Sequence, residues 1–241
     1  MINVFQNSEG LSRAAAELIL DISNKSMEKK DKFSLVLSGG STPKQTYKFL
    51  TQPHYRDNIK WDKTFLFWGD ERFVPQDDPL NNYKMAKDIF IKKIPVPGKN
   101  VFPIPTKGKP SVCASEYENE IKKYFDSGNT SFDLILLGLG ENGHTASLFP
   151  NTDILREENK LIKEVYVNEI NMYRISMTAK LINNSKNILF LVFGEEKAEM
   201  VSKIIEGNSD PDNLPAQLIK PSGGTIKWYL DKAAASKLKI T

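Results

Sequence analysis

Four short runs of apolar residues stand out along the chain, and a glycine-containing turn closes each of them. The runs are five to seven residues long: Phe33–Leu37, Thr64–Trp68, Phe132–Leu137 and Asn187–Phe193. Strands that are apolar on both faces are typical of a parallel sheet covered by helices on its two sides. The runs therefore predict four strands of such a sheet.

The segments between these runs repeat apolar residues at helical spacing. In the clearest case, Leu11, Leu18 and Ile22 fall on one face of the segment 11–28. Helices are predicted at 11–28, 43–50, 82–90, 112–125, 197–205 and 226–235. Strands that alternate with helices predict an α/β fold, a Rossmann-like and mostly parallel sheet with right-handed crossovers. The Pro-rich stretch 95–110 also carries apolar residues, so we expect an ordered connection there and a single domain over residues 1–241.

Composition excludes several classes of protein. The chain has 241 residues with 1 Cys, Cys113, and 2 His, which excludes an internal disulfide and cysteine-rich zinc sites. A single cysteine suits a reducing compartment, and we expect a cytoplasmic protein. The net charge of +3, from 33 basic and 30 acidic residues, is too balanced to indicate a nucleic-acid partner. Neither a membrane span nor a signal peptide is expected from the apolar pattern.

Each predicted strand ends in a segment with unusual residues, at the edge of the sheet where α/β proteins bind ligands. The first segment is LSGGSTP at 37–43, which joins a strand to a helix. Its glycines let the backbone approach a ligand, and the helix N-terminus favours an anion such as phosphate. A plain helix cap, with Ser41 or Thr42 as the capping residue, explains the same sequence. The loop lacks the Lys of a Walker A motif, which disfavours a nucleoside triphosphate.

Two further strand ends carry charged residues. In WGDERFVP (68–75), Arg72 is suited to clamp a phosphate, and Asp70 or Glu71 to contact sugar hydroxyls or move protons. A local salt bridge is the alternative interpretation of these charges. In FGEEKA (193–198), Lys197 begins a predicted helix, where its charge opposes the helix dipole unless an anionic ligand is bound. A solvated lysine is the alternative there.

The remaining strand end is the segment GLGENGHTASLFP at 138–150. It contains a G-x-G-x-x-G match, but a dinucleotide site needs a long helix directly after the third Gly, and Pro150 interrupts one early. The segment instead predicts a Gly-rich loop that presents His144 at the ligand edge of the sheet, where an imidazole is suited to proton transfer. The other histidine, His54, lies in a polar segment and is expected to be exposed.

Taken together, these segments resemble 6-phosphogluconolactonases. The matching strings are LSGGSTPKQTY (37–47), WGDERFVP (68–75) with LNNYKMAKD (80–88), LGLGENGHTASLFP (137–150), and RISMTAKLIN with NILFLVFGEEKA (174–183, 187–198). The string IKWYLDKAAA (226–235) resembles the family's last helix. Order and spacing agree over nearly the whole length, and GHTASLFP together with GDERFVP is quite specific.

The resemblance implies a fold related to glucosamine-6-phosphate deaminases and ribose-5-phosphate isomerases. It also implies hydrolysis of 6-phospho-D-glucono-1,5-lactone to 6-phospho-D-gluconate in the oxidative pentose phosphate pathway. Members of the family need no metal and no organic cofactor, so none is expected here. The expected partner is the small sugar-phosphate lactone, bound by a monomer or weak homodimer.

Roles for individual residues follow from the same resemblance. His144 would act as general base on the attacking water, and Asp70 would orient the substrate or His144. The residues implied to bind the 6-phosphate are Gly40, Ser41, Thr42, Arg72 and Lys197. Weaker candidates for substrate contact are Gly39, Glu71, Asn82, Asn142 and Arg174.

One residue departs from the family pattern, which usually has Asp directly before the Gly-His pair. This chain has Asn142, which accepts a hydrogen bond but brings no charge, so His144 is expected to be a weaker base, with Asp70 or Glu71 as substitutes. The first alternative function is a glucosamine-6-phosphate deaminase, disfavoured because the carboxylates of its Gly-His loop are absent. The second is a non-catalytic sugar-phosphate-binding module, disfavoured because His144 is present and no helix-turn-helix extension precedes the first strand.

Overall fold

A six-stranded parallel sheet forms the centre of the computed structural model, which describes residues 1–239; residues 240 and 241 of the predicted domain lie outside it. The strand order is β1-β9-β8-β5-β2-β3, and every neighbouring pair is parallel. The strands are β1 (Ile2–Phe5), β2 (Phe33–Leu37), β3 (Thr64–Trp68), β5 (Leu134–Leu137), β8 (Asn187–Val192) and β9 (Thr225–Asp231). The four strands predicted from apolar runs are confirmed, and they occupy four adjacent positions, β8-β5-β2-β3.

A second, three-stranded sheet is antiparallel, with β7 (Met172–Met177) between β4 (Asp70–Arg72) and β6 (Ile162–Val167). The apolar pattern did not predict it, because β4 has only three residues, all charged, and polar residues interrupt the apolar ones in β6 and β7. Strand β4 follows β3 after a single residue, Gly69, whose N–H donates to Leu37 O and whose carbonyl accepts from Met177 N. Gly69 therefore joins the two sheets next to the carboxyl ends of β2 and β3.

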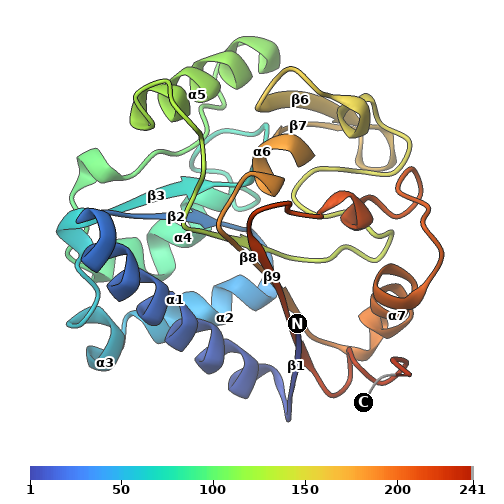
Figure 1. Cartoon of the computed structure of the whole chain (residues 1–241). Helices are drawn as coiled ribbons and strands as arrows, with labels where there is room; N and C mark the ends of the chain where they lie inside the picture. The colour runs from blue at the N-terminus through green and yellow to red at the C-terminus, as the bar shows by residue number, and fades with distance from the viewer. Residues whose placement is uncertain (240–241) are drawn as a thin grey trace.

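Helices cover the central sheet on both sides (Figure 1). They are α1 (Ser8–Lys30), α2 (Ser41–Leu50), α3 (Pro53–Arg56), α4 (Asn82–Ile89), α5 (Pro110–Tyr124), α6 (Ala179–Asn183) and α7 (Ala198–Glu206). Figure 1 shows α1 and α2 on one side of the sheet and α5 on the other, near β6 and β7. Five of the six predicted helices are confirmed, with ends that differ by at most three residues. The long helix α1 buries Leu11, Ala15 and Ile19, which share one face.

The sixth predicted helix, 226–235, was wrong, because Thr225–Asp231 forms strand β9 and the residues after it form turns. The strand fits between β1 and β8 and exchanges backbone hydrogen bonds with both. Trp228 also stacks on Phe190 of β8, with ring centroids 3.9 Å apart and an angle of 6° between the rings. Sheet pairing on both sides therefore outweighs the helical pattern over the first six residues of the segment, 226–231.

The chain leaves the neighbouring strands β2 and β5 in opposite directions. From β2 it proceeds through α2 to β3 on one side, and from β5 it proceeds to β8 on the other. Open α/β sheets bind ligands at such a switch point, in the crevice outside the carboxyl ends of the strands. None of the helices within residues 1–239 has the length and apolar character needed to cross a membrane.

Candidate active site

A cavity of about 270 Å³ lies at the carboxyl ends of β2, β3, β5 and β8. All four segments predicted at the strand ends contribute to its lining, so the parallel sheet brings them together. The lining includes Ser38, Gly39, Gly40, Ser41, Thr42, Asp70, Arg72, Asn82, Gly140, His144, Arg174, Glu196 and Lys197. The cavity therefore combines a helix N-terminus, three basic side chains and one histidine.

The N-terminus of α2 opens onto this cavity. Gly40 is the N-cap residue and has φ +102°, a conformation that favours glycine, and it offers no capping side chain. Neither Ser41 nor Thr42 caps the helix, so that alternative was wrong. The buried Tyr47 hydroxyl fixes the start of the loop, because it donates to Ser38 O and accepts from Ser38 N. The first N–H groups of α2 are thus left for a ligand.

Gly39 allows the loop to lie directly against Asn82, at the start of α4. A Cβ atom on Gly39 would lie 2.0 Å from Asn82 Oδ1, a separation that no side chain tolerates. The Asn82 side chain in turn donates to Asp70 O at 3.0 Å. These contacts fix the loop after β2 against the loop after β3.

Glu71 does not line the cavity, although it adjoins two residues that do. Its carboxylate is buried and accepts hydrogen bonds from the backbone N–H groups of Arg72, Asn82 and Tyr83, at 2.7–2.9 Å. Burial raises the pKa of Glu71 to about 7, against the opposing effect of these hydrogen bonds. The carboxylate therefore closes the N-terminus of α4, together with Asn81, whose side chain accepts from Lys84 N.

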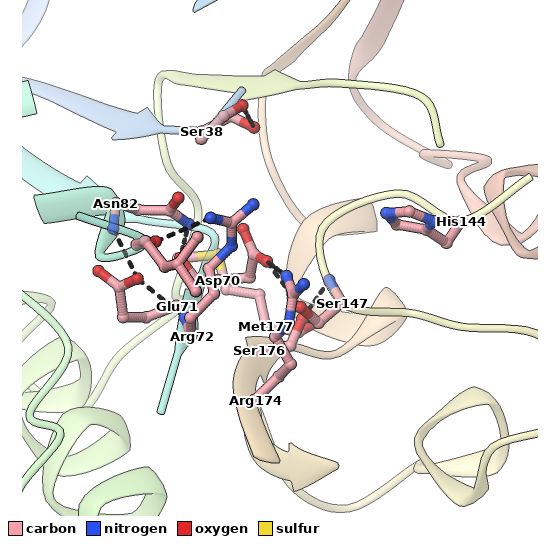
Figure 2. A network of polar contacts seen from close by, with 12 residues as sticks. Ser38, Asp70, Glu71, Arg72, Asn82, His144, Ser147, Arg174, Ser176 and Met177 are labelled. Carbon is pink, nitrogen blue, oxygen red and sulfur yellow. Dashed lines mark hydrogen bonds and ion pairs between the residues drawn. The ribbon is translucent and has the colours of Figure 1, made fainter. Parts of the chain in front are cut away.

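Asp70 lies at the centre of a polar network (Figure 2). Its Oδ2 accepts a hydrogen bond of 2.6 Å from Ser147 Oγ and lies 3.5 Å from Arg174 Nη1. Arg72 is held by a hydrogen bond of 2.7 Å from its Nη1 to Leu80 O. The Nε–H groups of Arg72 and Arg174 are buried and have no acceptor among the residues that the structure describes. Both guanidinium groups therefore have unused hydrogen-bonding capacity beside the cavity.

Lys197 lies in a short 3₁₀ turn, Glu195–Lys197, directly before α7. Its side chain is 19% exposed, and its Nζ lies 3.4 Å from Glu141 Oε1, on a carboxylate that is 74% exposed. An exposed partner at this distance holds a lysine only weakly. The ammonium group therefore stays available to the cavity that it lines.

His144 lies in a compact loop between β5 and the second sheet. Its ring stacks on Phe149, with centroids 4.1 Å apart, and packs so closely on Gly140 that a Cβ there would lie 2.0 Å from Nδ1. The ring Nδ1 lies 2.5 Å from Asn142 Oδ1. Burial lowers the pKa of His144 to about 4, opposed by the charge of Asp70 and assisted by Arg174, Lys197 and Arg72. The imidazole is thus neutral near pH 7, as a general base must be.

Sequence reasoning missed two residues of this region. Ser147, which binds Asp70, lies within the GHTASLFP string but was not singled out. Glu169 binds the Asn142 side chain from a segment that showed no motif. His54 is exposed, as predicted, and lies 3.3 Å from Glu17. Within residues 1–239, no three His, Cys, Asp or Glu side chains are arranged to hold a metal ion.

Comparisons with known proteins extend over nearly the whole chain. The model of the family described as "Glucosamine-6-phosphate isomerases/6-phosphogluconolactonase" matches residues 6–228. The 6-phosphogluconolactonase of Synechocystis sp. is 36% identical over 242 residues, which cover 99% of this chain and 98% of that relative.

Solved structures show the same fold. A structure named devB protein has a TM-score of 0.89 and 35% identity, and the match covers 98% of this chain and 99% of that one. A monomeric glucosamine-6-phosphate deaminase has a TM-score of 0.84 and 26% identity, covering 98% and 99%. Because a deaminase shares the fold, the backbone alone does not distinguish the activities within this family.

Proposed function

The chain belongs to the glucosamine-6-phosphate isomerase/6-phosphogluconolactonase family, and we propose that it hydrolyses 6-phospho-D-glucono-1,5-lactone to 6-phospho-D-gluconate. One observation carries the proposal. A neutral histidine, His144, lines the same cavity as an open helix N-terminus with two basic side chains, Arg72 and Lys197. Such a site combines a base for water with a binding site for phosphate.

The phosphate end of the substrate binds at the start of α2. The backbone N–H groups of Gly40, Ser41 and Thr42 donate to its oxygens, where the helix dipole favours negative charge. Arg72 and Lys197, which line the same cavity, neutralise the phosphate. Anchoring at this end leaves the lactone ring to extend toward the loop that carries His144.

The chemical step uses the free nitrogen of His144. An amide oxygen only accepts hydrogen bonds, so the contact with Asn142 Oδ1 places the proton on Nδ1 and leaves the lone pair on Nε2. Nε2 removes a proton from water as the water oxygen attacks the lactone carbonyl. The tetrahedral intermediate then breaks the bond to the ring oxygen, and the imidazolium returns the proton to that oxygen.

Asp70 supports this step through its charge. The described residues include no hydrogen bond between Asp70 and His144, yet the Asp70 carboxylate raises the pKa of the imidazole and so stabilises the imidazolium that forms. Arg174 and Ser147 hold the carboxylate in place. Asn82 and Gly39 shape the sugar-facing wall, and Glu71 acts indirectly, by fixing α4.

The test is turnover of freshly generated lactone, corrected for spontaneous hydrolysis. His144→Ala should lower kcat by about 10²–10⁴, the usual contribution of a general base, while 6-phosphogluconate still binds. The wild-type rate should persist as the pH falls to 5 and decline toward pH 4, because the base is lost only below its lowered pKa. His54→Ala is the matched control. Near-wild-type turnover in His144→Ala would refute the base assignment.

Deamination of glucosamine 6-phosphate is the second candidate, since a deaminase of this family shares the fold. Asn142 argues against it, because the position directly before the Gly-His pair lacks a carboxylate for ring opening. Release of ammonia from glucosamine 6-phosphate at a rate above that of lactone hydrolysis would reverse the order of the two candidates.

The free and buried Cys113 supports a location in a reducing compartment, and we propose the cytoplasm.

A further inference from the structure

The amide of Asn142 connects His144 to a carboxylate on a different part of the chain. Its Oδ1 faces His144 and lies 2.5 Å from Nδ1 and 3.3 Å from the backbone N. Its Nδ2 donates to Glu169 Oε2 at 3.0 Å. Glu169 lies in the turn Asn168–Ile170, which joins β6 to β7. The three side chains thus form one line of hydrogen bonds that ends at the imidazole.

The direction of the amide in this line decides which nitrogen of His144 carries the proton. With Oδ1 toward the ring, Nδ1 must donate and Nε2 is free to accept a proton. With the amide reversed, its NH₂ group would donate to Nδ1, and the proton of the neutral ring would move to Nε2. The reversed arrangement therefore leaves no free base on the Nε2 side of the ring.

Asn142 alone does not fix its own direction, because an amide group can turn over. A carboxylate accepts hydrogen bonds and does not donate them, so Glu169 pairs only with the NH₂ end of Asn142. The backbone N–H of His144 adds a weaker preference for the same direction, at 3.3 Å. The preference of the Asn142 amide for one direction therefore originates mainly at Glu169.

We propose that Glu169 is a positioning residue, which keeps the Asn142 amide oxygen toward His144 and thereby holds the imidazole in the Nδ1–H form with Nε2 as base. This inference rests on the proposed function for its effect on turnover, but its effect on the proton position is independent of any substrate. Glu169 is exposed, so it acts mainly through the geometry of the hydrogen bond rather than through long-range charge.

The first experiment measures the proton position directly by ¹⁵N NMR of the histidine rings near pH 7. The chain has 2 His, so His54→Ala assigns the two sets of resonances without ambiguity. Wild-type His144 should show the Nδ1–H form, and Glu169→Ala should shift the ring toward the Nε2–H form. Glu158→Ala, at an exposed glutamate outside this line of hydrogen bonds, is the control and should leave the spectrum unchanged. An unchanged His144 in Glu169→Ala overturns the proposal.

The second experiment measures kcat and KM for lactone hydrolysis. Glu169→Ala should lower kcat roughly tenfold, the size of one charge-assisted hydrogen bond, with KM within about twofold. In an Asn142→Asp background, the carboxylate at 142 accepts in either orientation, so Glu169→Ala should then cause no loss. An equal loss in both backgrounds would show a purely structural role and overturn the proposal.

The two experiments separate this inference from the proposed function. A wild-type protein without lactonase activity would refute the function, while the NMR comparison would still decide whether Glu169 sets the proton position. Activity in the wild type, with no change of kcat or of the His144 resonances in Glu169→Ala, would leave the function intact and refute the role of Glu169.

Discussion

Two helix N-termini lie beside the same cavity; the protein's own side chains close one of them and leave the other open. At α4, the buried carboxylate of Glu71 accepts from the N–H groups of Asn82 and Tyr83, and Asn81 caps the first turn. At α2, the N-cap residue is Gly40, which has no side chain, and the first turn faces the cavity. One helix therefore carries its own anion, whereas the other is left to receive one.

The same backbone dipole therefore serves folding at α4, and under the proposed function it serves binding at α2. The internal anion of α4 is costly to keep charged, as the pKa of about 7 for Glu71 shows, yet it fixes Arg72 and Asn82 beside the cavity. The open end of α2 has no such internal anion, and it lines the same cavity as Lys197, where we propose that the phosphate of the substrate binds. Exchanging or removing these charges tests the contrast.

The largest effect is expected from giving α2 an internal anion as well. Ser41→Asp places a carboxylate in the first turn of α2, which should stabilise the helix by about 0.3–1 kcal/mol. It should also raise KM about 100-fold or more, because the carboxylate occupies the anion site and repels the phosphate. Ser41→Asn, of nearly the same shape but uncharged, should lose far less. Steady-state kinetics and thermal unfolding measure the two effects; an unchanged KM in Ser41→Asp would place the phosphate elsewhere.

A smaller effect is expected from removing Arg72 or Lys197, the cations that we propose neutralise the phosphate at α2. Arg72→Ala and Lys197→Ala should each weaken binding of 6-phosphogluconate by about 1.5–3 kcal/mol, the range for a hydrogen bond to a charged group. Calorimetry measures the loss, which should shrink at high salt because the charges are screened. Lys48→Ala, on the exposed face of α2, is the control. Equal affinities in all three variants would contradict a phosphate site at α2.

The open end of α2 was predictable from the sequence, and the closed end of α4 was not. The apolar runs fix four strands, and the carboxyl ends of parallel strands share one edge, so the sequence placed Arg72, His144 and Lys197 near one another. The sequence around Glu71 does not distinguish it from its charged neighbours. The direction of its side chain depends on α4, which begins eleven residues later along the chain and covers Glu71.

Contacts between distant segments explain the other failures. Residues 226–235 have a helical pattern, but the slot between β1 and β8 makes part of them a strand. Glu169 has no motif around it and reaches Asn142 only because the antiparallel pairing of β6 with β7 places their connecting turn beside the loop of His144. Local propensity does not determine such contacts, because they depend on the tertiary context of each segment.

The smallest effect in this series concerns the internal anion of α4 and is measured as stability rather than binding. Glu71→Gln replaces one carboxylate oxygen by an NH₂ group, so a buried backbone N–H loses its acceptor and the protein should lose about 1–3 kcal/mol. Because the pKa of Glu71 is raised to about 7 in the folded state, its contribution to the free energy of unfolding is full at low pH. That contribution is lost as the pH rises through 7. The deficit of the variant should therefore be larger at pH 5 than at pH 8, with Glu28→Gln, an exposed carboxylate on α1, as control. Urea unfolding at the two pH values measures this, and a deficit independent of pH would mean that Glu71 is as readily ionised in the fold as in water.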